Sequence, residues 1–305
     1  MYDLTTGEFV ASAPHSRELS LPQQNHYNVN TMPGLEIGLR CVDDNDEFST
    51  SGFRVTWRNQ AVGGDRRYGY MVAGHALPDD CADNGGDGTN TRRIINENNV
   101  DVEQDQASGD FISLNKLARG IHDNGTHEMD AAIVRCESNK CGTRENNIHL
   151  AGSPKITGGG DDDPWPNYDN HDTEVQDVDQ VISVNDTLCF TGAHANGVNC
   201  GWYGGVIDNR IHMIDFANGY PGPGDPVDGG DSGGPVYSIL NAAGPRAVGI
   251  ISKSFDSGFP FNIFWYGGFY RVDNAMLDIT TQFGAIHELE ICAEAADGGW
   301  DFDCD

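Results

Sequence analysis

The sequence predicts an all-β protein, and three observations support this class. Short apolar runs alternate with turn clusters, few stretches have a helical period, and 39 of the 305 residues are glycine. Many short strands separated by Gly-rich turns are typical of a β-sandwich or β-barrel. A chain of this length can bury one large core or two cores of ordinary size, so two packed barrels would fit.

The expected strands of the first half are apolar runs bounded by turn residues. They lie at Leu35–Val42, Phe53–Trp57, Tyr68–Ala73, Phe111–Leu114 and Ala131–Val134. The stretch 78–106 is rich in Asp, Asn and Gly, and we expect it to be a surface loop. The second half opens with Val178–Val184, followed by the Leu188–Thr191 run.

The composition is strongly acidic. Asp and Glu number 47 against 18 basic residues, which gives a formal charge of −29. Nucleic acids and anionic membranes repel such a field, so neither is an expected partner. Only four residues are lysine, and the acidity is spread along the chain, a composition that resembles proteins of extreme halophiles. An ordinary acidic secreted protein is the alternative interpretation.

Eight cysteines favour a disulfide framework in an exported protein, because none has a Cys-x-x-Cys spacing. The chain begins Met1-Tyr2-Asp3-Leu4, without a basic or apolar leader, so a signal peptide is not visible here. No run of 18 apolar residues is present, so we expect no membrane span.

One stretch carries a strong chemical signal: Gly229-Gly230-Asp231-Ser232-Gly233-Gly234-Pro235. It resembles the Gly-Asp-Ser-Gly-Gly-Pro signature with which chymotrypsin-like serine endopeptidases present their nucleophile. A serine hydroxyl is a weak nucleophile at neutral pH and needs a general base, an acid that orients the base, and oxyanion donors. Without these groups the stretch would be only a glycine turn.

Two further motifs resemble the same family. Met71-Val72-Ala73-Gly74-His75 is similar to its Thr-Ala-Gly-His motif, which implies that His75 is the general base. Asp130 stands directly before the apolar run Ala131–Val134, similar to the family's Asp-Ile-Ala-Leu-Val motif, which implies that it orients the base. The chain order His, Asp, Ser is that of chymotrypsin. A histidine that closes a strand for packing reasons is the structural alternative for His75, and a single aspartate among 34 carries little weight without the apolar run and the chain order.

The resemblance implies two packed antiparallel six-stranded Greek-key β-barrels with the active site in the cleft between them. The N-terminal barrel would span 35–150 and contain His75 and Asp130, and the C-terminal barrel would span 175–290 and contain Ser232. The remaining segments are an N-terminal arm or pro-region remnant, an acidic Gly/Pro linker and a C-terminal tail, at 1–34, 151–174 and 291–305.

The same resemblance assigns roles around the nucleophile. The N–H groups of Gly230 and Ser232 would form the oxyanion hole, and Asp231 would hold the turn by pairing with an internal cation or N–H group. The residues expected at substrate are Pro226, where trypsin-type enzymes carry aspartate, and Ser252, Lys253 and Ser254. Because neither this aspartate nor the histidine of glutamate-specific relatives is present, we expect a medium-sized or large apolar residue before the cleaved bond.

The glycine-rich hairpin between Cys189 and Cys200 resembles a disulfide loop of the streptogrisin and α-lytic protease branch, which is the nearest bacterial branch. The other expected pairs are Cys41 with Cys81, Cys136 with Cys141, and Cys292 with Cys304, although spacing alone does not decide connectivity.

No metal or cofactor requirement is expected. Carboxylates in the linker are hard oxygen ligands that suit Ca²⁺, but their spacing matches no EF-hand, so a calcium site and a plain acidic run both stay open. These carboxylates are Asp161, Asp162, Asp163, Asp169 and Asp172.

The sequence therefore predicts a secreted, salt-adapted, monomeric serine endopeptidase that acts on protein or peptide substrates. A catalytically silent binding module and a latent form blocked by residues 1–34 are the alternatives.

Overall fold

We describe the fold from a computed structural model of the chain. The described residues are 2–3, 8–9, 33–34, 36–40, 46–59, 63–76, 92–97, 101–105, 111–115, 118–123, 129–136, 147–148, 155–156, 173–175, 177–179, 181–192, 198–208, 210–216, 227, 230–239, 244–256 and 265–292.

The second half of the chain forms a closed antiparallel barrel. Around the barrel the order is β16, β17, β18, β21, β20 and β19, and β19 pairs again with β16. Three strands in chain order are thus followed by three in reverse order, a Greek-key arrangement. The bounds are β16 Thr187–Thr191, β17 Val198–Asp208, β18 Ile211–Asp215, β19 Pro235–Ser238, β20 Arg246–Asp256 and β21 Trp265–Arg271.

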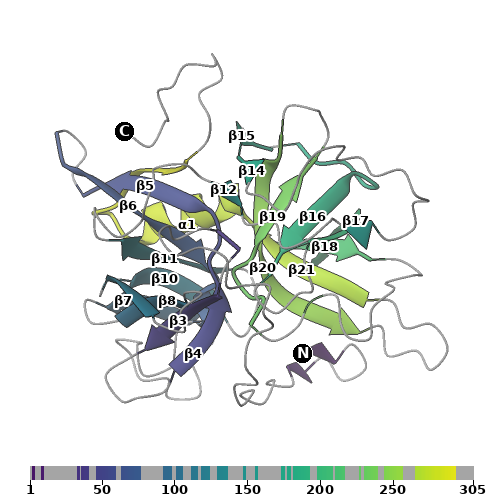
Figure 1. The fold of residues 1–305 in the computed structure, drawn as a ribbon, viewed down its shortest axis with the longest axis horizontal. Coiled ribbons are helices and arrows are strands. Elements are labelled where there is room, and N and C mark those ends of the chain that lie inside the picture. The colour runs from purple at the N-terminus through teal and green to yellow at the C-terminus, as the bar shows by residue number, and fades with distance from the viewer. Residues whose placement is uncertain are drawn as a thin grey trace.

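The first half, together with the C-terminal strand β22, forms a curled six-stranded sheet beside a four-stranded sheet (Figure 1). The larger sheet has the order β22-β5-β6-β11-β10-β7, in which β6 is followed by strands in reverse chain order, as in the second barrel. Its bounds are β5 Arg54–Arg58, β6 Arg66–Val72, β7 Arg92–Glu97, β10 Ala118–Asp123, β11 Asp130–Cys136 and β22 His287–Ile291. The smaller sheet has the order β4-β3-β8-β9, with bounds β3 Glu36–Arg40, β4 Asp46–Thr50, β8 Asp101–Asp105 and β9 Phe111–Asn115.

The remaining elements are short, apart from one helix. β1 pairs with β2 and with the end of β20, β12 pairs with β14, and β13 and β15 pair with β17 and β20. The bounds are β1 Tyr2–Asp3, β2 Glu8–Phe9, β12 Asn147–Ile148, β13 Lys155–Ile156, β14 Thr173–Glu174, β15 Asp177–Val178, the 3-10 turn η1 Gly74–Ala76 and the helix α1 Val272–Gln282.

The structure confirms the predicted all-β class and the two-barrel arrangement. The expectation of a surface loop over 78–106 is wrong, because β7 and β8 lie within it. β7 pairs along its whole length with β10, so distant main-chain hydrogen bonds override the polar local composition. The helix α1 also has no counterpart among the elements predicted from the sequence.

One buried cluster joins the two β bodies, which are the curled and four-stranded sheets (the first body) and the closed barrel (the second body); the barrel also holds a buried cluster of its own. Phe53 and Met71 from the first body and Tyr237 and Ile250 from the second belong to the same buried cluster. Helix α1 contributes residues such as Ile279 to this cluster, while β22 returns the chain to the first body by pairing with β5. The C-terminal segment therefore helps to hold the two bodies together.

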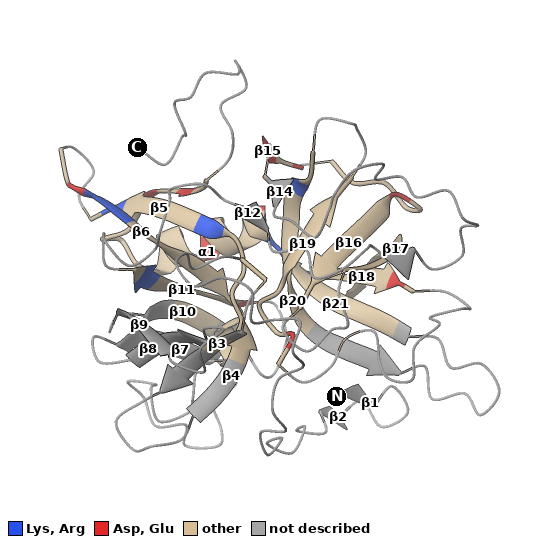
Figure 2. Cartoon of the chain, in the orientation of Figure 1, with Lys and Arg blue, Asp and Glu red and all other residues tan. Residues whose placement is uncertain are grey.

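Arginine residues lie together at the β5–β6 hairpin (Figure 2). The blue segment at the start of β6 contains Arg66 and Arg67, and Arg58 on the paired strand β5 lies 2.6 Å from Glu288. No helix among the described residues is long and apolar enough to cross a membrane.

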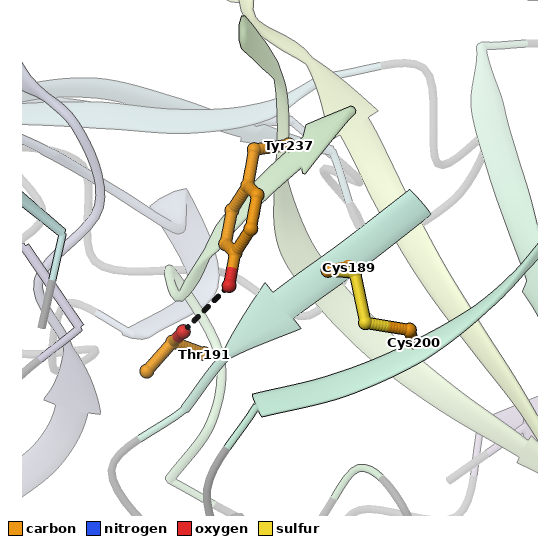
Figure 3. The surroundings of a disulfide bond; sticks show 4 residues. All are labelled: Cys189, Thr191, Cys200 and Tyr237. Atoms are coloured by element: carbon orange, nitrogen blue, oxygen red, sulfur yellow. Dashed lines mark hydrogen bonds between the residues drawn. A yellow bond between two sulfur atoms is a disulfide. The ribbon is translucent and has the colours of Figure 1, made fainter. Parts of the chain in front are cut away.

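The predicted Cys189–Cys200 disulfide is confirmed, and it joins paired positions of β16 and β17 (Figure 3). Next to it the hydroxyls of Thr191 and Tyr237 lie 3.3 Å apart. Burial raises the pKa of Tyr237, which keeps the phenol neutral. Cys136 and Cys292 are also disulfide-bonded, but their predicted partners Cys141 and Cys304, like the predicted Cys41–Cys81 pair, lie outside the described residues.

Replacing Cys189 and Cys200 together by alanine should lower the free energy of unfolding by about 2–4 kcal/mol, because the bond restricts the unfolded chain. Equilibrium denaturation in urea measures this change. An unfolding midpoint equal to that of the parent protein would contradict the stabilising role of this bond.

Candidate active site

Three polar side chains from separate segments form one hydrogen-bonded line. His75 belongs to η1, Asp130 begins β11, and Ser232 lies in the turn before β19. The Nε2 atom of His75 is 2.8 Å from Ser232 Oγ, and its Nδ1 atom is 2.8 Å from Asp130 Oδ2. The structure thus brings together the three residues to which the sequence motifs point.

Strand pairing explains how His75 meets Asp130. β6 and β11 are antiparallel, with Val72 opposite Ala132, so the chain that leaves β6 passes beside the start of β11. The backbone N–H of His75 donates to Asp130 Oδ1 at 2.9 Å. A Cβ on Gly74 would lie 2.4 Å from the Ile121 carbonyl oxygen, so this close approach requires glycine.

Asp130 is a buried carboxylate, with only 5% of its side chain exposed. It accepts hydrogen bonds from the backbone and the ring of His75, and from the hydroxyl of Ser252 in the second barrel. Buried carboxylates require such donors. A proton on Nδ1, donated to this carboxylate, makes Nε2 the acceptor for the Ser232 hydroxyl.

The Ser232 turn is held by the second barrel. Gly233 N–H donates to the Ile251 carbonyl at 2.7 Å, and Gly234 N–H donates to the Asp231 carbonyl at 2.9 Å. Gly230 and Gly233 have φ angles of 98° and 90°, in the left-handed region that favours glycine. The two glycines therefore allow the tight turn that aims the serine hydroxyl at His75.

Asp231 packs inside the protein next to this turn. Its side chain is fully buried and lies against Gly192, where an added Cβ would be 2.2 Å from Oδ1. The structural role expected for Asp231 fits this packing, although the cation or N–H expected to pair with it stays a prediction.

Three residues that the sequence did not indicate also contact the turn. Ser49 and Thr50, at the end of β4, donate to carbonyl oxygens of Ser232 and Gly230. A Cβ on Gly52 would lie 2.7 Å from the Gly233 carbonyl oxygen. Their Ser-Thr-Ser-Gly run reads as an ordinary polar turn, so only the contact itself identifies them.

A buried phenol lies near the Asp130 carboxylate. Burial, together with its hydrogen bond to Asp278 and the charges of Asp278 and Asp130, raises the pKa of Tyr270 despite the opposing effect of Arg210. Arg210 binds Asp278 with 2.8 and 3.0 Å contacts. Tyr270 therefore stays neutral and links α1 to the second barrel without adding a charge beside Asp130.

The remaining predicted site residues are only partly described. Lys253 and Ser254 lie on β20, but their side chains are outside the described set, as is Pro226. Within the described residues no group of three His, Cys, Asp or Glu side chains could hold a metal. The linker aspartates considered for Ca²⁺ lie outside the described residues.

No protein-family model matches the sequence, and no curated protein matches it. Solved structures with a similar arrangement include three proteases of low sequence identity. A Nocardiopsis protease is 17% identical with a TM-score of 0.44, and the match covers 86% of this chain and 99% of that one. Thermobifida fusca protease A is 16% identical with a TM-score of 0.43, covering 86% and 98%. A glutamic acid specific serine protease, described as using a histidine triad in substrate binding, is 14% identical with a TM-score of 0.44, covering 86% and 100%. These values establish no family.

Replacing Gly192 by alanine should destabilise the turn, because the new methyl group would overlap the buried Asp231 carboxylate. We expect the free energy of unfolding to fall by about 1–3 kcal/mol. Gly284→Ala is the matched control, since nothing lies within 4 Å of a Cβ at that position. Equal stability of the two variants in urea denaturation would show that Asp231 does not need this close contact.

Proposed function

We propose that this chain is a serine endopeptidase that hydrolyses peptide bonds through an acyl-enzyme intermediate. The observation that carries the proposal is the hydrogen-bonded line from Ser232 through His75 to Asp130. The distance is 2.8 Å from Ser232 Oγ to His75 Nε2, and 2.8 Å from His75 Nδ1 to Asp130 Oδ2. A nucleophile within hydrogen-bond reach of a base, which a third group orients, is the arrangement that acyl transfer requires.

Ser232 would attack the substrate carbonyl while His75 Nε2 accepts the hydroxyl proton. The resulting imidazolium is stabilised by the Asp130 carboxylate at Nδ1. His75 then donates that proton to the leaving amine as the peptide C–N bond breaks. In the second half of the reaction, His75 accepts a proton from a water molecule that attacks the acyl carbonyl, and returns it to Ser232 Oγ as the acyl C–O bond breaks and the acid product leaves. The His75 side chain is 32% exposed, so its ring can reach a bound substrate.

The N–H groups of Gly230 and Ser232 would stabilise the oxyanion that forms in each step. The φ angle of 98° at Gly230 supports this role, because a side chain would strain the backbone there. A donor of this kind typically contributes about 10²- to 10³-fold in rate.

β20 offers an edge for an extended peptide. One edge of β20 pairs with β21. Along the other edge, β19 pairs with β20 as far as Ile250, and β1 pairs with Phe255 and Asp256. Among the described strands, none pairs with the intervening Ser252–Ser254 segment on that edge. An added substrate strand would hydrogen-bond there, beside the Ser252 that contacts Asp130. This placement supports the role predicted for residues 252–254 and the proposal of a protein or peptide substrate.

Secretion and salt adaptation complete the proposal. The Cys189–Cys200 disulfide supports an oxidising, extracellular compartment. The formal charge of −29 supports adaptation to high salt, where the Debye length is about 3 Å at 1 M and self-repulsion is screened.

A fluorophosphonate probe should modify Ser232 in the active protein, because the His75 ring activates this hydroxyl. Intact-mass and peptide-mass spectrometry measure the adduct. Ser232→Ala should abolish labelling and lower kcat/KM on a protein substrate by about 10⁶-fold.

Ser183→Ala is the matched control, since it removes an exposed serine hydroxyl in the second half of the chain and should leave labelling intact. A folded parent protein that is not labelled at high salt would overturn the proposal and favour a catalytically silent binding module.

Dialysis to low ionic strength should reduce peptidase activity, and returning the protein to NaCl above about 1 M should restore it, because salt screens carboxylate repulsion. Activity and near-UV circular dichroism measured across a salt series test this. Full activity at low salt would contradict the salt adaptation while leaving the endopeptidase proposal intact.

A further inference from the structure

The end of β4 holds the backbone of the nucleophile turn through two hydroxyls. Ser49 Oγ–H donates to the Ser232 carbonyl, which also accepts the Thr50 N–H at 2.8 Å. Thr50 Oγ1–H donates to the Gly230 carbonyl at 2.7 Å. Both residues of β4 are fully buried, so water does not compete for these bonds.

These bonds fix the two ends of one short segment. Gly230 and Ser232 are the residues whose N–H groups we propose as oxyanion donors, and the carbonyl of each is held from β4. From the other side, Gly233 and Gly234 are held by the second barrel and by the turn itself. The segment is therefore clamped between the two β bodies.

Gly230 makes this clamp necessary. Its φ angle of 98° lies where glycine is permitted and other residues are strained, but glycine also rotates more freely than any other residue. The Thr50 hydroxyl holds the peptide plane that follows Gly230, which restricts the ψ angle of this residue. Oxyanion donors act through preorganisation, so a loss of alignment would lower the rate of the chemical step.

We propose that Thr50 and Ser49 are positioning residues that preorganise the oxyanion-binding segment of Ser232 from the opposite β body. This inference rests on the proposed endopeptidase function. On this inference the two hydroxyls raise the rate of acyl transfer and do not affect substrate binding. A purely structural role, in which the hydroxyls only satisfy buried polar groups, is the competing explanation.

The test compares Thr50→Val with Thr56→Val. Thr56 is also fully buried in the first body, but its hydroxyl has no hydrogen-bond partner, so the same change there removes a hydroxyl without removing such a bond. Thr50→Ser retains the donor and should rescue activity. Kinetics on a chromogenic peptide, and ¹⁹F NMR titration of the hemiketal formed with a peptidyl trifluoromethyl ketone, are the readouts.

For Thr50→Val we expect kcat to fall by about 10-fold, part of the 10²- to 10³-fold effect of an oxyanion donor. KM should stay within about twofold, and the hemiketal pKa should rise by about one unit as the oxyanion loses stabilisation. Thr50→Ser and Thr56→Val should match the parent protein in both readouts. If Thr50→Val does not fold, Ser49→Ala provides the test, with an expected fall in kcat of about threefold at unchanged KM.

Unchanged kcat and hemiketal pKa in Thr50→Val, or in Ser49→Ala where the valine variant does not fold, would overturn the inference and leave the hydroxyls a structural role. A parent protein that hydrolyses no peptide and forms no hemiketal would overturn the proposed function and this inference together. An active parent with an unaffected variant overturns the inference alone.

Discussion

The buried carboxylate of Asp130 is the group on which the site depends. Only 5% of its side chain is exposed, and a charge removed from water in this way must be offset by donors. His75 supplies its backbone and ring N–H groups from the first β body, and Ser252 supplies a hydroxyl from the second. These hydrogen bonds stabilise the buried charge and orient the histidine ring, and the bond from Ser252 joins the two β bodies at the site.

Close backbone approach is the second constraint. Gly74, Gly192 and Gly233 each lie so near to another segment that a Cβ would be within 2.4 Å of a neighbouring atom. The atoms concerned are the carbonyl oxygens of Ile121 and Thr50 and the carboxylate of Asp231. Interiors packed this tightly transmit small displacements, so the Ser232 hydroxyl is positioned by contacts with both β bodies and not by its own turn alone.

The sequence was informative wherever the relevant pattern is local. The apolar runs that became β5, β6, β9 and β11 were recognisable from composition and turn signals, and the Cys189–Cys200 bond joins directly paired residues of one hairpin. The positions of His75, Asp130 and Ser232 followed from short strand-end motifs, and the structure brings these side chains together. Their catalytic roles stay predictions.

Patterns that depend on distant partners were not recognisable. β7 is polar in composition and is a strand because β10 pairs with it. Thr50 lies 180 residues from Gly230 in the chain, and nothing in a Ser-Thr-Ser-Gly run identifies that partner. In α1 the buried residues Val272, Ala275 and Ile279 do follow a helical spacing, but the stretch is short and its last turn is a β-branched run, 279–281. β22 joins the first body only through its long-range pairing with β5.

The central claim is that Ser232 becomes covalently acylated during turnover. Rapid mixing of the protein with a chromogenic peptide ester, followed by acid quenching and peptide-mass spectrometry, measures this most directly. The account predicts a burst of product close to one equivalent per chain, with the acyl group on Ser232. A linear time course with no acylated peptide, or an acyl group on another residue, would contradict it.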